Sequence, residues 1–387
     1  MQLWPVGAWS LRLYYFWYFA AAGIYFPYVS LYYHEIHLDG AQIGLLASLA
    51  PLAGVLLPPL WGLLSDRLGW RKRILITSVL TAAIVAPLVP LLGSFTLLLA
   101  IIVLLAVVLS PAVPLADATT LEWLRGNGGT FGNIRVFGSI GYLGSSLLVG
   151  ILFSGRHILW LFPLYGAVLF GACLATLIVP GQHDRAHLSS GEGIRSILRD
   201  RRVTIFLALV ILGYTSFAAY NTFFALYLKE LGAGTSAVGL ATGIATLCEL
   251  PGMVVAGMVI RKFGVKPVLL AGMGSLLIRW IGYALIHDYR LALLFQPLHA
   301  LGFASFYVAG VTFIDTLVPG RLRSTGQTLF TVAFFGAGAV IGSNLFGFLF
   351  DRIHGSGMFY VAAAIVTPAL LGLIVFVPNI RADEPAQ

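Results

Sequence analysis

The chain has 387 residues, of which 59% are hydrophobic and only 10% are charged. A soluble globular domain carries roughly 25% charged residues, so water is not the main solvent of this protein. A bilayer core about 30 Å thick needs roughly 20 apolar residues per helix, so this chain can cross it many times. The net charge of +8 comes from basic residues dispersed over short loops, which indicates membrane topology and argues against nucleic-acid binding.

Apolar runs between charged residues and Gly/Pro punctuation predict twelve transmembrane helices. The first stretch carries one basic residue, Arg12, and no small-residue cleavage site, so we expect a retained helix and not a signal peptide. The predicted helices cover residues 11–33, 42–64, 73–93, 95–124, 133–153 and 157–179, followed by 204–229, 236–260, 267–286, 290–316, 325–350 and 357–378.

A polar loop divides the chain almost evenly. We expect an all-α integral membrane fold with six-helix bundles at residues 1–180 and 203–387, joined by a cytoplasmic linker over residues 181–202. Most Lys and Arg residues outside the helices lie in the even-numbered connections. Because basic loops stay in the cytoplasm, both termini are expected there, in a multi-pass protein of a bacterial inner membrane.

The two halves repeat each other. A shift of 195 residues superposes the first two helices of each half, and three more residues of offset align the fourth and fifth. Chance matches between Gly and Leu are the alternative, but the matched charged positions are uncommon in membrane helices. Parallel repeats of this kind place a substrate site between the halves. The matches include Tyr32 with Tyr227, Glu35 with Glu230, Gly62 with Gly257, Asp117 with Asp315, and Arg125 with Arg323.

A specific motif follows the second predicted helix. Residues 62–73 read GLLSDRLGWRKR, which resembles the signature loop of the major facilitator superfamily. The resemblance implies that this motif gates one face of a transporter, and topology alone is the alternative role for its basic residues. In the second copy, Arg261 stands where the first has Asp66. The gating residues that the resemblance implies are Gly62, Asp66, Arg67, Gly69 and Arg71.

Further motifs look like the 3-phenylpropionate transporter group, which is related to lactose permease and to nucleoside proton symporters. They are SPAVPLAD at residues 110–117, FGNIRVFGS at 131–139, Glu249, Arg279-Trp280 and QPLH at 296–299. The resemblance implies substrate binding by Asp117 and Arg135, and proton coupling by Glu249, Arg279 and His299. Lactose permease has an essential acid one turn after its histidine, where this chain has Gly302. Glu249 or Asp117 is therefore expected to carry the proton.

Charged residues inside the predicted helices need partners or a wet cavity, because each costs about 2.5–3.5 kcal/mol at a helix centre. A carboxylate beside an arginine can change its protonation as the pairing changes, which is the physics of proton coupling. For Glu249 and Arg279 a static ion pair is the alternative, and Asp117 and Arg135 could instead snorkel to the interface. His299 could relay a proton or serve as a satisfied structural residue.

Aromatic and amide side chains complete the expected substrate site. Rings facing a cavity stack on a solute and amides supply hydrogen bonds, whereas interfacial anchoring is the alternative for aromatic residues near helix ends. The glycines of helices 5 and 11 are expected to permit close helix packing. The further substrate-binding candidates are Tyr18, Tyr25, Tyr220, Asn221, Gln296 and Asn344.

These features predict a secondary active transporter, a proton symporter that imports a small organic solute by alternating access. An aromatic or other carboxylate, a sugar or a nucleoside is the expected substrate class. An efflux antiporter for drugs or metabolites is one alternative, and a membrane-embedded ligand sensor is another. No enzyme motif is found. We expect no cofactor besides the coupling proton, no metal, and a monomer whose partners are solute, protons and lipid.

Overall fold

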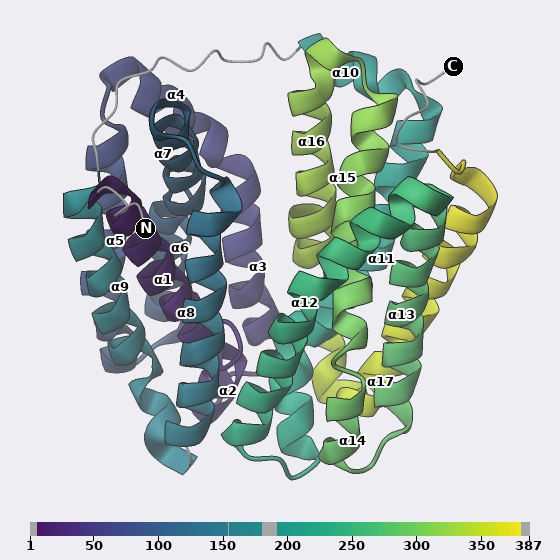
Figure 1. Cartoon of the computed structure of the whole chain (residues 1–387). Coiled ribbons are helices and arrows are strands. Elements are labelled where there is room, and N and C mark those ends of the chain that lie inside the picture. Colours follow the sequence, from purple (N-terminus) through teal and green to yellow (C-terminus); the bar gives the residue numbers. More distant parts are fainter. Residues whose placement is uncertain (1–5, 154, 180–191, 381–387) are drawn as a thin grey trace. The chain divides into compact units, whose positions relative to one another are not determined.

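The structure, a computed structural model, describes residues 6–153, 155–179 and 192–380 (Figure 1). Within these ranges the chain forms helices and connecting turns, with no strand. It divides into two compact units: Met1–His37 with Leu52–Leu188, called unit 1, and Leu38–Pro51 with Ser189–Gln387, called unit 2. Helix α3 (Gly40–Leu56) contributes to both, because its first turns pack on the second unit.

Unit 1 consists of helices that follow the predicted segments closely. Helix α1 packs against α8 and α9, and α9 also packs against α5. The elements are α1 (Val6–Tyr25), α2 (Val29–Glu35), α4 (Pro58–Leu68), α5 (Arg71–Val85), η1 (Ala86–Leu91), α6 (Phe95–Leu109), α7 (Ala112–Asn127), α8 (Phe131–Leu152), η2 (Gly155–Trp160) and α9 (Leu161–Ile178).

Unit 2 is built around α11 and α17, which pack along each other, and α13 packs on α17. Residues 181–191 of the expected linker lie outside the described residues, and the next stretch is helical. The elements are α10 (Glu192–Arg199), α11 (Arg201–Glu230), α12 (Thr235–Phe263), α13 (Val265–Leu285), α14 (Tyr289–Leu294), η3 (Ala300–Ser305), α15 (Phe306–Leu317), η4 (Gly320–Leu322), α16 (Arg323–Thr331), η5 (Val332–Ala337) and α17 (Gly338–Phe376).

Short polar side chains fix where several helices begin. Ser94 accepts a hydrogen bond from the Leu97 backbone at the start of α6, and Asp200 does the same for Arg202 at the start of α11. An N-cap oxygen of this kind satisfies one of the backbone N–H groups that the first helical turn leaves without a partner. The local sequence therefore sets these helix ends without help from tertiary packing.

The number of membrane spans is close to the prediction. Nine helices of the described ranges are long and apolar enough to cross a membrane, or ten if α3 and α4, bent by 45°, form one span. One of the nine, Arg323–Phe376, runs over 54 residues, but His354 within it has a φ of 58° and a ψ of 179°, so the helix is kinked there. Helix α1 lies outside the nine, and it is rich in Tyr and Trp. The count of twelve stays a prediction.

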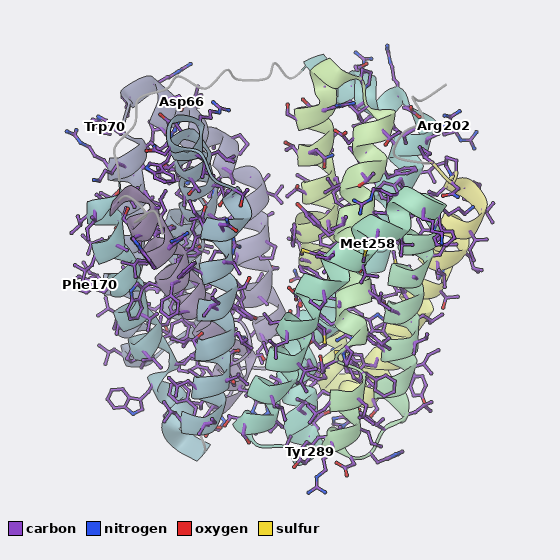
Figure 2. All side chains as sticks on the ribbon, in the orientation of Figure 1. Asp66, Trp70, Phe170, Arg202, Met258 and Tyr289 are labelled. Carbon is purple, nitrogen blue, oxygen red and sulfur yellow. The ribbon has the colours of Figure 1, made fainter. Side chains whose placement is uncertain are left out.

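Many large apolar side chains lie on the outside of the units. Figure 2 labels Phe170 at the edge of unit 1 and Met258 in unit 2, and these side chains are 48% and 49% exposed. Ile151 and Val375 are more exposed still, at 72% and 69%. Apolar surface of this extent is unusual for a soluble monomer and fits contact with lipid chains.

Glycines let helices approach closely within each unit. A Cβ atom at Gly141 of α8 would meet the backbone oxygen of Phe16 in α1, and one at Gly342 of α17 would meet the backbone oxygen of Thr215 in α11. The expected packing role is therefore confirmed for both. It is wrong for Gly144, because no atom lies within 4 Å of its Cβ position in the part of the chain that the structure describes.

We expect Gly141→Ala to destabilise the protein and Gly144→Ala to leave it unchanged or slightly more stable. Overpacking a tight contact costs about 1–3 kcal/mol, whereas alanine is favoured over glycine in an open helical position. Thermal unfolding in detergent checks both variants. Equal melting temperatures for the two variants would contradict the proposed packing of α1 on α8.

Candidate functional site

A carboxylate and an aromatic hydroxyl meet inside unit 1. Asp117 lies on α7 and Tyr15 on α1, and the Tyr15 hydroxyl donates to Asp117 Oδ1 over 2.6 Å. The Tyr15 hydroxyl also lies 3.2 Å from the Thr120 hydroxyl, one turn along α7. Asp117 is therefore held by a neutral donor from the first helix, and not at an exposed helix end.

Arg135 is the other expected residue of this site. Its guanidinium carbon lies 3.7 Å from the ring centroid of Phe19 and 5.4 Å from that of Tyr15. Among the described residues it has no ion pair and no hydrogen bond, so Asp117 and Arg135 surround Tyr15 without bonding each other. The guanidinium stacks on the Phe19 ring, and its N–H donors have no bonded acceptor among the described residues.

In unit 2, three of the expected residues form a continuous chain of polar contacts. His299 Nε2 lies 3.1 Å from Glu249 Oε1, and its other ring nitrogen, Nδ1, lies 3.3 Å from an Arg279 terminal nitrogen. Helix α12 supplies Glu249 and α13 supplies Arg279. His299 stands between them, so Glu249 and Arg279 have no direct ion pair within the described residues.

The partners of His299 assign its tautomer. Arginine can only donate, so Nδ1 of His299 accepts from Arg279. A neutral imidazole with an accepting Nδ1 carries its proton on Nε2, and that N–H then donates to Glu249. His299 is thus neutral in this arrangement and connects a cation to a carboxylate. We name Glu249, His299 and Arg279 the relay.

Arg279 is completely buried, and neutral groups surround it. One terminal nitrogen donates to the Tyr283 hydroxyl over 3.2 Å and to Gln296 Oε1 over 3.5 Å. The guanidinium carbon lies 4.4 Å from the ring centroid of Tyr220. Its Nε has no hydrogen-bond partner in the structure. A charge in this position is tolerated only because acceptors and π-faces replace its hydration.

Gln296 and Tyr220, both expected to bind substrate, belong to the shell around Arg279. The Tyr220 hydroxyl donates to Gln296 Oε1 over 2.9 Å. The amide nitrogen of Gln296 donates to the Tyr283 hydroxyl over 3.0 Å and to the Ala292 carbonyl over 3.4 Å. Every polar atom of the buried Gln296 side chain is therefore engaged inside the protein.

Of the remaining expected substrate ligands, Tyr18 lies beside the Arg135 site, since its ring contacts that of Phe19 with centroids 5.4 Å apart, and no contact joins the other three to these clusters among the described residues. Asn221 and Asn344 are exposed, and the Asn344 amide donates to Val340 of its own helix over 2.8 Å. Tyr18 stacks on Tyr14 with centroids 5.7 Å apart. The Tyr25 hydroxyl lies 3.4 Å from that of Tyr33.

The gating motif forms an ion-pair network at one end of unit 1, where Figure 2 labels Asp66. Arg71 at the start of α5 contacts Asp66 Oδ1 over 3.4 Å and Glu122 Oε2 over 2.6 Å. Gly69, with a φ of 64°, ends α4 in the left-handed region, where glycine is favoured. The motif's Gly62 and Arg67 also lie on α4.

Both units use a lysine near the motif as a helix cap. Lys72 Nζ donates to the Leu177 carbonyl at the end of α9 over 2.9 Å. Lys266 Nζ donates to the Ile374 carbonyl near the end of α17 over 2.7 Å. A cation at a helix C-terminus satisfies carbonyls that lack a partner and complements the helix dipole. The second copy therefore keeps a structural role although it lacks the acid of the first.

Several functional neighbours escaped the sequence analysis. Tyr15 and Phe19, one helical turn apart on α1, hold Asp117 and Arg135. Tyr283 follows Arg279 by one turn of α13. Glu122 contacts the motif arginine. A spacing of four residues from the predicted Arg279 is a usable signal for Tyr283, because residues at i and i+4 share a helix face.

Two π-helical turns, η3 and η5, lie beside the relay. The first begins directly after His299, and Phe303 within it stacks on His299 with centroids 5.4 Å apart. Phe303 also contacts Phe334 of η5 at 5.6 Å. Such turns are rare and often mark functional sites, and no sequence rule predicted them.

Comparisons with known proteins agree with this architecture. The sequence profile of the MFS_1 like family matches residues 8–361. The maltose permease of Geobacillus stearothermophilus is 29% identical over 378 residues, covering 97% of this chain and 95% of the permease. A protein of Escherichia coli (strain K12), described as a probable 3-phenylpropionic acid transporter, is 27% identical over 368 residues, or 93% and 95% of the two chains.

A solved structure shares the fold. The crystal structure of the nucleoside transporter NupG aligns with a TM-score of 0.87 at 18% identity, covering 96% of this chain and 99% of NupG. The expected all-α integral membrane fold is thereby confirmed.

We expect Tyr283→Phe to lower the melting temperature of the protein by a few degrees. The change leaves Nη2 of Arg279 with only its longer bond to Gln296, and the Gln296 amide nitrogen with only its longer bond to Ala292, at a cost of about 1–2 kcal/mol. Tyr360→Phe on α17, where the side chain is 52% exposed, is the matched control. Thermal unfolding in detergent that shows equal loss, or none, for the two variants would contradict the structural role of the Tyr283 hydroxyl.

Proposed function

Because this chain belongs to the MFS_1 like family, whose profile covers most of its length, it is a secondary transporter and not an enzyme, and we propose that it is a proton-coupled symporter. It imports a small organic solute by alternating access, and that solute is an aromatic or other carboxylate, a sugar or a nucleoside. The bundles at residues 1–180 and 203–387 act as its moving halves. The ion-pair network of Asp66, Arg71 and Glu122 gates one face of the transporter.

The relay is the observation that carries this proposal. Glu249 is the relay member with the most exposed side chain, at 25%, against 9% for His299, while Arg279 is fully buried. Protons therefore enter and leave at Glu249. A proton on this carboxylate neutralises the anion that His299 contacts. The charge of Arg279 is then no longer balanced by a carboxylate within the relay. Protonation and the local structure are thus coupled.

The relatives support a solute carrier. Two of them are described as a maltose permease and a probable 3-phenylpropionic acid transporter. Asp117, Arg135, Tyr18, Tyr25 and Asn221 remain the proposed solute contacts, with Tyr220, Gln296 and Asn344 as further candidates. The protein works as a monomer in a bacterial inner membrane with both termini in the cytoplasm, and it needs no cofactor besides protons.

Gradient-driven uptake in proteoliposomes tests the proposal. One proton entering through a force of 100 mV releases about 2.3 kcal/mol, enough for roughly 50-fold accumulation of a solute carried one to one. We expect Glu249→Gln to abolish accumulation while solute exchange continues, because the variant keeps a hydrogen-bond acceptor for His299 but cannot titrate.

Asp315→Asn is the control, since Asp315 forms a half-exposed ion pair with Arg323 outside the relay. Accumulation that survives Glu249→Gln would remove the relay from the coupling step. Accumulation only under an outward proton gradient would identify an efflux antiporter. Solute binding without accumulation or exchange under either gradient would identify a sensor.

A further inference from the structure

The guanidinium of Arg135 lies in a cradle that fixes its plane. Its carbon stands 3.7 Å from the Phe19 centroid. A Cβ atom at Gly138, one turn along α8, would lie 2.6 Å from an Arg135 terminal nitrogen and 2.9 Å from Phe19 Cδ2. A side chain at position 138 would therefore force the guanidinium or the Phe19 ring to move. The Phe19 ring and the space at Gly138 therefore favour this orientation of the guanidinium.

The charge of Arg135 is not matched by a bonded partner. Asp117, the other charged group of this site, accepts from the Tyr15 hydroxyl over 2.6 Å, and no hydrogen bond or ion pair to Arg135 exists in the described part of the chain. A cation in a membrane helix needs an acceptor. An oriented guanidinium presents parallel N–H donors that match the two oxygens of a carboxylate.

The relay adds a second reason for an anionic solute. It holds one carboxylate and one guanidinium, joined by a neutral histidine, so its net charge is zero when Glu249 is ionised. A proton on Glu249 leaves one positive charge in a low-dielectric environment, where charge is costly. A monoanion taken up together with that proton leaves the total charge of the loaded protein equal to that of the empty protein. A neutral sugar or nucleoside would not.

We propose that the solute is an organic monocarboxylate and that Arg135, stacked on the Phe19 ring, binds its carboxylate. One proton accompanies each solute molecule, so that transport moves no net charge. This inference rests on the proposed symport and narrows its substrate class. It also fixes the driving force, because an electroneutral cycle responds to the pH gradient and not to the membrane potential.

Uptake into proteoliposomes under an inward pH gradient tests the inference. The probes are 3-phenylpropionate, benzoate and lactate as acids, 3-phenylpropanamide as a neutral isostere, and maltose and uridine as neutral solutes. Protein-free vesicles measure the passive entry of each acid. We expect at least one acid to accumulate, the amide not to compete with it, and a potassium diffusion potential of either sign to leave its accumulation unchanged.

Two variants locate the carboxylate. Arg135→Gln is expected to raise the half-saturation concentration of the transported acid about 10- to 100-fold, the range for loss of a charged hydrogen bond. Gly138→Ala is expected to weaken uptake several-fold by displacing the guanidinium. Gly144→Ala, on the same helix with no atom within 4 Å of its Cβ position, is the matched control and should transport normally. Size-exclusion profiles show whether each variant is folded.

The outcomes separate this inference from symport itself. Accumulation of maltose or uridine, or equal competition by the amide, would overturn the anionic class and leave proton-coupled import intact. Accumulation of an acid that follows the membrane potential would overturn electroneutrality. Normal half-saturation in folded Arg135→Gln would remove the carboxylate from this site. If no probe accumulates in either gradient direction, the importer itself is wrong and this inference falls with it.

Discussion

Burying a guanidinium in a membrane protein requires acceptors around it, and unit 2 is organised by this need at Arg279. The side chain has no exposed surface, so water cannot supply those acceptors. Tyr283, Gln296 and His299 supply them instead, from α13 and from the segment that leads into the π-helical turn η3. The carboxylate of Glu249 is reached only through His299. A polar network this dense inside a membrane unit specifies one arrangement of the helices.

The two units share a scaffold but differ in chemistry. Each has a lysine that caps the last long helix of its half, Lys72 on Leu177 and Lys266 on Ile374. Each also has an arginine beside aromatic rings. In unit 1 the guanidinium of Arg135 is stacked and has no bonded acid, whereas in unit 2 it belongs to a relay. The internal repeat gives both halves the same helical scaffold. Sequence differences between the halves assign solute binding to unit 1 and proton coupling to unit 2 in this proposal.

Membrane-scale features were predictable because lipid imposes them on the sequence. Apolar segments and the rare charges within them could be located from the sequence alone, whereas the choice of Glu249, His299 and Arg279 for proton coupling came from the resemblance to a known transporter group. The partners of those charges did not follow. Tyr15 contacts Asp117 across more than a hundred residues of sequence, and nothing local distinguishes it from the other tyrosines of α1. The glycine pattern likewise did not separate the packed Gly141 from the open Gly144, because packing depends on the facing helix.

The protonation state of His299 is the most direct test of the relay. Nitrogen-15 magnetic resonance of histidine-labelled protein in lipid, with His299→Gln as the subtraction control, reads that state directly. The account predicts a neutral imidazole at neutral pH with its proton on Nε2, and a change in this signal in Glu249→Gln. An imidazolium, or a neutral ring protonated on Nδ1, would break the contact with Arg279 and contradict the relay.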